Sequence, residues 1–339
     1  MSGGGRKLRI GILGAGSVVE LYHLPVLRNL AGASIVWFCD KDLARARRLQ
    51  RACRGAQAHA QIEDCPDVDI VLVAIPVGYR REPLRHIFRS GWHALCEKPF
   101  AVTLAEHDAL VAEAARSGVQ IGAGLMRRYY GGTIAARRLI ASGAFGAVER
   151  VWAAEGARML ATGHEEGWYQ SDRQAAGGGV LMETGSHLID QAFRILGVSG
   201  FTSPQCQQTV YKDIDLETRV TSDLEIPGSR RIEFALAVSR LNDFRGGIHI
   251  RLSNATLKVG VLPDAPLVVL GVDGTALGRI EGDGGANHVY QAFYLEWEDF
   301  VAQCTTGQSA AVSAETARHG TAFIEACYRN AVTLDRRAQ

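Results

Sequence analysis

The chain has 339 residues, enough for two domains that each bury a core of their own. Hydrophobic residues make up 47% and charged residues 22% of the sequence, which is typical of a folded globular protein and excludes a disordered or collagen-like chain. The 37 Lys and Arg residues are balanced by 36 Asp and Glu, so the charge argues against nucleic acid or an anionic membrane and favours a small molecule as the partner.

The cysteines and the N-terminal residues bear on the compartment. Seven cysteines are scattered along the sequence and never spaced as C-x-x-C, so neither a disulfide framework nor a metal site is predicted. The Gly-rich first six residues lead into an apolar run without the apolar region and cleavage site of a signal peptide. No stretch approaches the ~20 unbroken apolar residues of a membrane-spanning helix. We therefore expect a cytoplasmic protein in a reducing environment.

Short apolar runs alternate with helical patterns over the first 125 residues. The predicted strands are 8–13, 34–39, 70–75, 93–96 and 120–124, and predicted helices end at 27 or span 43–54, 83–90 and 104–116. Thr103 and Glu106 form a capping box ahead of the last of these helices. Strands that alternate with helices imply an α/β fold with a parallel, doubly wound Rossmann sheet, here in a domain of residues 1–125.

The rhythm changes in residues 126–339. From 207 to 272 the sequence alternates apolar and polar residues in short runs broken by Pro-Gly and Gly-Gly pairs, which is typical of antiparallel strands. A helix over 134–142, a strand over 148–156 and a helix over 179–196 precede this region, and helices over 287–306 and 314–332 follow it. We expect a C-terminal α+β domain with a large, open, mostly antiparallel sheet.

Gly14 and Gly16 form a turn between the first predicted strand and the first helix. Glycines at this point let the backbone turn tightly and approach the pyrophosphate of a dinucleotide, which the helix N-terminus then attracts. Ser17 and Val18 open that helix and are further cofactor-binding candidates. Val19 stands where the third glycine of the fingerprint is expected, so we expect the helix slightly farther from the sheet. The alternative is a plain glycine-containing turn.

Asp40 ends the second predicted strand, roughly 20 residues after the glycines. A carboxylate at this spacing hydrogen-bonds the adenosine ribose hydroxyls and repels a 2′-phosphate, which favours NAD over NADP. Lys41 and Arg45 offer a 2′-phosphate some compensation, or are merely solvated residues at the start of a helix. The choice of NAD is therefore a preference only.

Glu97-Lys98-Pro99 follows the strand predicted over 93–96. Open α/β sheets bind ligands at the carboxyl ends of their strands, and a lysine there reaches the nicotinamide pocket. A surface Glu-Lys pair is the alternative for this motif alone.

Glu183 and His187 are four residues apart in a predicted helix, and therefore stand on one face within reach of a shared substrate. The spacing suits a proton-relay pair, and the alternative is a hydrogen-bonded core histidine. The glycines at 177–179 let a nicotinamide ring or a sugar approach the start of this helix, or form a flexible loop.

Four motifs occur together in this sequence. They are Gly14-x-Gly16, His23-Leu24-Pro25, Glu97-Lys98-Pro99 and Gly177-Gly178-Gly179-x-x-x-Glu183-x-x-x-His187-x-x-Asp190. With them the chain resembles, over nearly its whole length, the glucose-fructose oxidoreductase, inositol dehydrogenase and MocA-like family of sugar dehydrogenases. The resemblance implies a Rossmann domain followed by a mixed domain with an open sheet, and catalysis by Lys98 together with His187.

The resemblance also implies substrate contacts. Arg128 and Tyr129 match a family segment near nicotinamide and substrate, and Trp168 and Tyr169 precede the triple glycine where family members often place such contacts. Aromatic faces suit sugar rings. As alternatives, Arg127 or Arg128 pairs with a carboxylate, and Trp168 anchors a core.

The chain departs from the family pattern at two places. Glu183 stands where many members carry aspartate, which displaces the carboxylate by more than ~1 Å. After the fourth strand, Ile75 and Pro76 lead to Arg80, where the family often has Thr-Pro-Asn and then histidine, so the loop that faces the nicotinamide is unusual. We expect Arg80 and Arg81 either to contact an anionic substrate or to be solvated residues at the start of a helix.

From these observations we expect an NAD(P)-dependent oxidoreductase that transfers a hydride between nicotinamide and a hydroxyl or keto carbon of a sugar, sugar derivative or cyclitol. Lys98 is expected to stabilise alkoxide charge, and His187 and Glu183 to relay the proton. Two alternatives are a redox-neutral NAD-dependent lyase or glycosidase and a non-catalytic sensor of dinucleotide or sugar. An open sheet that needs covering favours a homodimer or homotetramer.

Overall fold

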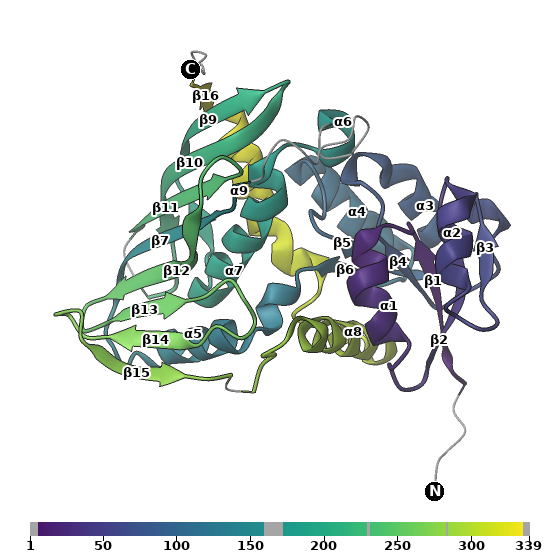
Figure 1. Ribbon diagram of the computed structural model, residues 1–339, viewed down its shortest axis with the longest axis horizontal. Helices are drawn as coiled ribbons and strands as arrows, with labels where there is room; N and C mark the ends of the chain where they lie inside the picture. The colour runs from purple at the N-terminus through teal and green to yellow at the C-terminus, as the bar shows by residue number, and fades with distance from the viewer. Residues whose placement is uncertain (1–5, 159–171, 229–230, 283, 335–339) are drawn as a thin grey trace, which may run out of the picture. The chain divides into compact units, whose positions relative to one another are not determined.

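The computed structural model describes residues 6–158, 172–228, 231–282 and 284–334, and it divides into two compact units (Figure 1). The first unit comprises Met1–Ala101, Ala105–Gly124 and Val289–Thr316. The second comprises Val102–Leu104, Leu125–His288 and Ala317–Gln339. Within the described ranges, no helix has both the length and the apolar character needed to cross a membrane.

A six-stranded parallel sheet forms the centre of the first unit, in the order β3-β2-β1-β4-β5-β6. Its strands are β1 (Leu8–Leu13), β2 (Ala33–Cys39), β3 (Gln57–His59), β4 (Ile70–Val73), β5 (His93–Glu97) and β6 (Ile121–Gly124). All four residues of β4 are fully buried apolar side chains, as expected for a strand covered on both faces. The strand order reverses between β1 and β4, and this reversal is where open α/β sheets bind ligands. The predicted Rossmann sheet is confirmed.

The helical segments of the first unit bury apolar side chains in its core. They are η1 (Val19–His23), which continues as α1 (Leu24–Leu27), and α2 (Leu43–Gln50), η2 (Ile62–Asp64), η3 (Val77–Tyr79), α3 (Arg81–Arg89), α4 (Leu104–Arg116) and α8 (Val289–Thr306). The side chain of Asp42 accepts the backbone N–H of Ala44 at 3.0 Å and so caps α2. The first helix begins as a π-helical turn, in which Val19 is fully buried.

Helix α8 packs in the first unit although it is far from it in sequence. Trp297 and Phe300 of α8 are fully buried. A Cβ atom on Gly122 of β6 would lie only 2.9 Å from the Phe300 ring, so the close packing requires glycine there. Because α8 returns to the first unit, the division differs from a single boundary at residue 125.

A ten-stranded sheet forms the second unit, in the order β15-β14-β13-β12-β7-β11-β10-β9-β16, with β8 paired to β10. Its strands are β7 (Val148–Gly156), β8 (Gly200–Phe201), β9 (Gln205–Tyr211), β10 (Ile214–Glu225), β11 (Ile232–Ser239), β12 (Phe244–Leu252), β13 (Thr256–Val259), β14 (Leu267–Leu270), β15 (Ala276–Ile280) and β16 (Ala331–Thr333). Neighbours are antiparallel except β7 with β11 and β9 with β16. The expected large, mostly antiparallel sheet is confirmed.

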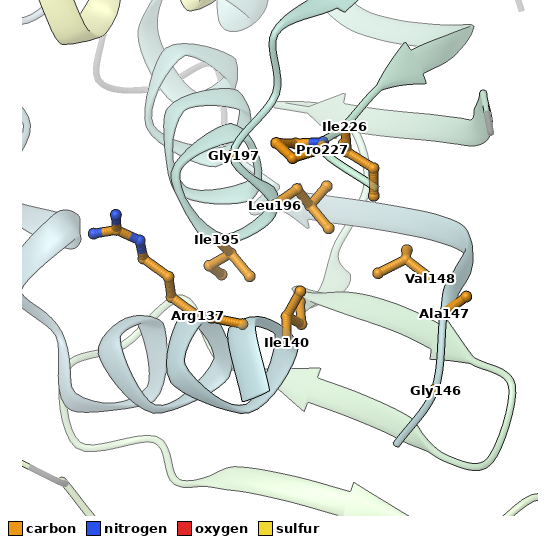
Figure 2. A pocket seen from close by; sticks show the side chains of 11 residues that line it. Arg137, Ile140, Gly146, Ala147, Val148, Ile195, Leu196, Gly197, Ile226 and Pro227 are labelled. Atoms are coloured by element: carbon orange, nitrogen blue, oxygen red, sulfur yellow. The ribbon is translucent and has the colours of Figure 1, made fainter. Parts of the chain in front are cut away.

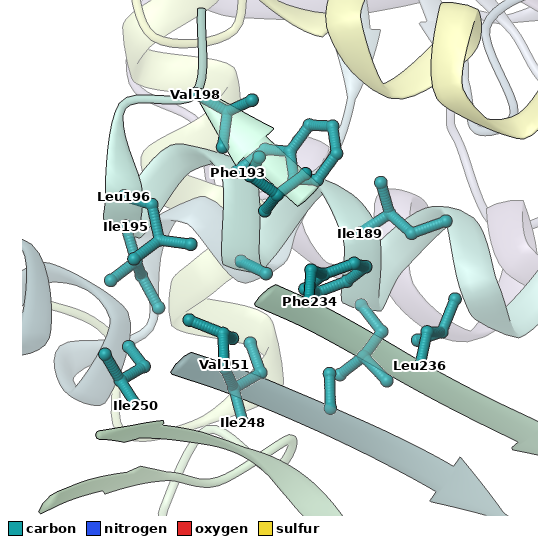
Figure 3. Packing of buried hydrophobic residues seen from close by; sticks show 14 of the residues in the cluster. Val151, Ile189, Phe193, Ile195, Leu196, Val198, Phe234, Leu236, Ile248 and Ile250 are labelled. Atoms are coloured by element: carbon teal, nitrogen blue, oxygen red, sulfur yellow. The ribbon is translucent and has the colours of Figure 1, made fainter. Parts of the chain in front are cut away.

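One face of this sheet is covered by helices, and the core lies between the two layers (Figures 1 and 3). The helical segments of the unit are η4 (Met126–Tyr129), α5 (Gly131–Ser142), α6 (Arg173–Ala176), η7 (Leu181–Gly185), α7 (Ser186–Leu196) and α9 (Arg318–Arg329). The turn η8 (Ala314–Ala317) lies at the boundary, with its first three residues in the first unit. In Figure 3, Ile189 and Phe193 of α7 face Phe234 and Leu236 of β11. Burial of each such side chain contributes about 1.5–3 kcal/mol. Glu233, between buried neighbours on β11, points to the other face and is exposed.

The C-terminal residues differ from the single helix expected over 314–332. A short 3₁₀ turn precedes α9, which ends at Arg329, and β16 then pairs in parallel with β9. Ala331, Val332 and Thr333 suit a strand, but their partner lies more than 100 positions earlier, so local pattern did not distinguish them from the end of a helix.

Candidate active site

The glycine turn follows β1 at the point where the strand order reverses. Gly14 has a φ of +101°, and a Cβ atom on it would lie 2.4 Å from the carbonyl oxygen of Ala74, so the turn itself requires glycine. A Cβ on Gly16 would meet nothing within 4 Å. Ser17 is exposed and Val18 half-buried at the start of the helix. The residues therefore fit a dinucleotide, because the backbone around Gly16 is open to a phosphate group at a helix N-terminus.

Asp40 lies at the end of β2 with both carboxylate oxygens fixed by backbone N–H groups. Oδ2 accepts from Ala15 at 2.7 Å and Oδ1 accepts from Asp42 at 2.9 Å. This places the carboxylate beside the glycine turn, where the sequence predicts a ribose contact. Lys41 is exposed, and its Nζ lies 6.0 Å from the ring centroid of Tyr79.

Arg80 is buried and donates to backbone carbonyl groups that surround the predicted nicotinamide loop. It donates to Ile75 at 2.8 Å, to Pro99 at 2.5 Å and also to Glu97. The guanidinium, which is part of a residue only 3% exposed, thus ties the loop after β4 to the end of β5. This geometry favours a structural role for Arg80 over the anionic-substrate role considered from sequence. Ile75 and Pro76 are half-buried in that loop.

Glu97 is the last member of a row of hydrogen bonds that begins in α8. The indole Nε1–H of Trp297 donates to Nδ1 of His23 at 3.0 Å, and His23 Nε2 lies 2.8 Å from Glu97 Oε1. His23 and Trp297 are fully buried and Glu97 is 7% exposed. Because Nδ1 of His23 accepts a hydrogen bond, a neutral His23 carries its proton on Nε2 and donates it to the carboxylate. The row therefore favours an ionised Glu97.

The positive charges around Glu97 also favour its ionised form. Burial disfavours the carboxylate and would raise the pKa of Glu97, but the hydrogen bond from His23 opposes this effect. With the positive charges of Lys98 and Arg80 added, the pKa of Glu97 lies below its ordinary value. Lys98 is half-buried at the carboxyl end of β5, and its backbone N–H donates to Glu97 Oε2 at 3.0 Å. A cation is thus held next to a buried anion at the ligand-binding edge of the sheet.

In the second unit, Glu183 and His187 fall on either side of the junction between η7 and α7. Glu183 lies in the π-helical turn, and its carboxylate pairs with the buried Arg240, which follows β11. His187 is 8% exposed in the first turn of α7. Lys98 belongs to the first unit and His187 to the second, so their joint action stays a prediction.

Arg128 and Arg127 each pair with a carboxylate, which was the alternative to substrate contact. Arg128, 4% exposed, binds Asp190 through two hydrogen bonds, of which Nε to Oδ2 is 2.8 Å. Arg127 binds both oxygens of Glu155, at 2.6 and 2.8 Å. Because a carboxylate engages each guanidinium group, little of either remains for a substrate to contact. The substrate role of Arg128 stays a prediction. Tyr129 is half-buried next to it.

Packing requires the second and third residues of the triple glycine. A Cβ on Gly178 would lie 2.1 Å from the hydroxyl of Tyr328, and one on Gly179 would lie 2.2 Å from the carbonyl oxygen of Asp215. The fully buried carboxylate of Asp215 accepts the N–H groups of Gly179 and Leu181 at 2.7 and 2.8 Å, and the Tyr328 hydroxyl at 2.8 Å. Burial, followed by the charge of Asp215, raises the pKa of Tyr328 well above its ordinary value. These glycines thus bring a carboxylate to the start of the helix that carries His187.

Trp168 and Tyr169, the other predicted substrate contacts, lie outside the described residues. Sequence reasoning did not single out Trp297, Arg240, Asp215 or Tyr328. Their partners are 274, 57, 36 and 149 positions away, and no local pattern links such pairs. The histidine of His23-Leu24-Pro25 was a usable signal, because a histidine in an otherwise apolar helix needs a buried partner.

A cavity of about 350 Å³ lies elsewhere in the second unit (Figure 2). Ile140 of α5, Ile195 of α7, Val148 of β7 and Pro227 line it, and Arg137 lies at its side. Its lining is mainly apolar and contains none of the predicted site residues. The candidate residues therefore fall in two groups, one at the carboxyl edge of the sheet in the first unit and one around the junction of η7 and α7 in the second.

Two family models match the sequence. The model described as an oxidoreductase family with an NAD-binding Rossmann fold matches residues 8–125, and the model of the GFO/IDH/MocA C-terminal domain matches residues 133–258. Together they cover more than half of the chain.

Curated relatives match over part of their length. A protein assigned as the oxidoreductase subunit of UDP-kanosamine synthase in Amycolatopsis mediterranei is 32% identical over 198 residues, which are 58% of this chain and 54% of that protein. The D-glucoside 3-dehydrogenase of Escherichia coli is 26% identical over 198 residues, 56% of this chain and 54% of that enzyme. The matches span about half the length of these relatives.

Among solved structures, a 3-ketoreductase from Actinomadura kijaniata, in complex with NADP and TDP-benzene, is similar with a TM-score of 0.81. The match covers 97% of this chain and 99% of that one at 17% sequence identity. At this identity the likeness shows the fold, and it confirms the two-part α/β architecture over nearly the whole chain.

Proposed function

We propose that this chain, which belongs to the GFO/IDH/MocA family of oxidoreductases, transfers a hydride between a nicotinamide dinucleotide and a hydroxyl- or keto-bearing carbon of a sugar, sugar derivative or cyclitol. The observation that carries the proposal is the carboxyl edge of the first sheet. There the turn at Gly14 and Gly16, the carboxylate of Asp40 and the cation of Lys98 follow β1, β2 and β5. Relatives named for a glucoside 3-dehydrogenase and for a UDP-kanosamine synthase subunit support a sugar-derived substrate.

The cofactor we propose is NAD in preference to NADP. Asp40 presents a carboxylate fixed by two backbone N–H groups, which suits ribose hydroxyls and repels a 2′-phosphate. Arg45 forms an ion pair with Asp42 at 3.3 Å, which reduces the compensation that it offers to a phosphate. When bound, the dinucleotide supplies a nicotinamide ring that accepts or donates the hydride.

The protein groups then manage the proton. Lys98, a cation beside the buried Glu97, stabilises the developing charge on the substrate oxygen, and His187 takes or returns the proton. Glu183 is held by Arg240, so we assign it to positioning rather than to direct proton transfer. The proposed cofactor site consists of Gly14, Gly16, Ser17, Val18, Asp40, Lys41, Ile75, Pro76, Glu97 and Lys98.

The test is absorbance at 340 nm with purified protein, NAD or NADP, and a panel of sugars, cyclitols, sugar acids and nucleotide sugars. Substrate-dependent formation of NADH supports the proposal and identifies the substrate class. A silent panel, with dinucleotide binding shown by calorimetry, contradicts net hydride transfer. It would favour redox-neutral chemistry or a sensor, and product analysis by mass spectrometry separates these two.

We further propose a homodimer or homotetramer in the cytoplasm. The sheet face opposite the helices carries Trp152, which is 40% exposed and packs edge-to-face on His249 at 5.2 Å. An exposed indole in the middle of a broad sheet is typical of a protein interface. Light scattering tests the assembly, and Trp152→Glu should shift it towards monomer. All seven cysteines are free thiols, which suits a reducing compartment.

A further inference from the structure

The row formed by Trp297, His23 and Glu97 is not explained by the fold alone. A buried carboxylate costs free energy unless it is hydrogen-bonded, and apolar side chains would fill the same space more cheaply. Both oxygens of Glu97 are nevertheless engaged, Oε1 by His23 and Oε2 by the backbone N–H of Lys98. The Glu97 carboxylate is therefore hydrogen-bonded directly to Lys98, the residue proposed to act on the substrate.

The hydrogen bond from Trp297 decides what His23 can do. An indole N–H only donates, so Nδ1 of His23 must accept and cannot carry a proton at the same time. His23 is therefore a neutral donor to Glu97, and the negative charge of the pair stays on the carboxylate. Without this restriction the histidine could present its unprotonated nitrogen, which would favour a protonated Glu97.

We propose that Trp297 and His23 are positioning residues that keep Glu97 ionised and thereby hold the neighbouring Lys98 as a cation. The inference rests on the proposed function only for its consequence in catalysis. The titratable groups that face Glu97 are the neutral His23 from η1 and two cations, Arg80 at the start of α3 and Lys98 itself. Arg80 contacts the backbone carbonyl of Glu97, so His23 provides the side-chain partner that sets the state of the carboxylate.

The test reads the charge of Lys98 directly. The sequence contains five lysines, at positions 7, 41, 98, 212 and 258, so [ε-¹³C]lysine gives a simple NMR spectrum in which Lys98→Arg identifies the Lys98 signal. Glu97→Gln should lower the midpoint of the Lys98 titration by about one pH unit or more, since an opposite charge is lost. His23→Leu should produce a shift in the same direction. His23→Gln should restore the wild-type midpoint, because its amide can accept from Trp297 and donate to Glu97.

A matched pair of tryptophans separates the hydrogen bond from packing. Trp297→Phe removes the donor to His23 and should lower the Lys98 midpoint. Trp37→Phe is the control, since Trp37 is also fully buried in the first unit but donates its indole N–H to the carbonyl of Pro66 at 2.9 Å. In Trp37→Phe the midpoint of the Lys98 titration should equal that of the wild type.

Two results would overturn the proposal. The first is an unchanged Lys98 midpoint in Glu97→Gln, and the second is a midpoint lowered in Glu97→Gln but unchanged in both His23→Leu and Trp297→Phe. If one variant is unfolded, the other still decides the second case. The titration needs neither cofactor nor substrate, so a lowered midpoint together with a silent 340 nm panel would refute the proposed function and leave this inference intact.

Discussion

Arg128 and Asp190 form a buried ion pair through two parallel hydrogen bonds, although 62 positions separate them in sequence. The pair ties the turn at Met126–Tyr129 to α7, three residues after His187. Removing one partner of a buried pair leaves an uncompensated charge, which is far more costly than losing an exposed pair.

Arg128→Ala should lower the free energy of unfolding by about 3–5 kcal/mol, measured by urea denaturation followed by circular dichroism. The matched control is Arg150→Ala, because Arg150 makes a similar two-point pair with Glu233 on the exposed sheet face. That variant should lose less than about 1 kcal/mol. An Arg128→Ala protein with wild-type stability and a raised KM for sugar would instead support a substrate contact.

Gly14 and Gly16 should respond differently to alanine. Gly14→Ala should lose at least about 1–2 kcal/mol of stability, because of its left-handed backbone and the 2.4 Å approach to Ala74. Gly16→Ala has open space and should keep its stability, but the added methyl group should raise the Kd for NAD about tenfold, or ~1.4 kcal/mol. Thermal unfolding and titration calorimetry measure the two effects. Equal dinucleotide affinity in Gly16→Ala and wild type would place the phosphates elsewhere.

Asp40→Ser should change the choice of cofactor. Removing the carboxylate takes away the ribose contact and the repulsion of a 2′-phosphate, so the ratio of kcat/KM for NAD to that for NADP should fall by about tenfold or more. Steady-state kinetics with both cofactors and one substrate measure this ratio. An unchanged ratio would mean that the Asp40 carboxylate only supports the glycine turn through Ala15.

Lys98→Met should reduce kcat at least about 100-fold while the Kd for NADH stays within a factor of about two. The reason is that methionine keeps the volume of the side chain but offers no charge to the substrate oxygen. Stopped-flow absorbance and NADH fluorescence give the two constants. Lys7→Met, at an exposed position of the same unit, is the control and should match the wild type. Near-wild-type turnover in Lys98→Met would remove Lys98 from the mechanism.

Glu97 should make stability depend on pH. Its pKa is lower in the folded protein than when unfolded, so the unfolded chain binds the proton more readily. The carboxylate therefore stabilises the fold above the unfolded pKa, and this stability is lost as the pH falls through the folded pKa. Urea denaturation between pH 3 and pH 7 should show a shallower loss in Glu97→Gln than in wild type. Parallel curves would mean that Glu97 has the same pKa in both states.

The parts of the fold and site that sequence predicted are those that local pattern encodes. Gly14, Asp40 and Lys98 each follow an apolar strand by one to two residues, and the rule that ligands bind at carboxyl ends places them at one edge. Strand β3 was missed because Gln57 and His59 are polar and give no apolar strand pattern. Its backbone pairing with β2 holds it in the sheet.

Contacts between distant segments were beyond local pattern. The triple glycine shows the reason: its spacing suggested an approach for a ligand, whereas Asp215 and Tyr328 occupy the space next to Gly178 and Gly179. The same applies to Glu183, whose carboxylate is directed by Arg240 from the end of a strand. The sequence motif therefore identified a group of candidate residues, but it did not show that the Glu183 carboxylate is paired with Arg240.

The return of the C-terminal segments to both units has a consequence for biosynthesis. The core of the first unit includes Trp297 and Phe300, and in the second unit Tyr328 donates a hydrogen bond to the Asp215 carboxylate at the start of η7. Neither unit possesses all of these buried contacts until the residues from Val289 onward have been synthesised. A chain stalled before residue 289 would lack Trp297 and Phe300 and would expose apolar surface of the first unit to chaperones.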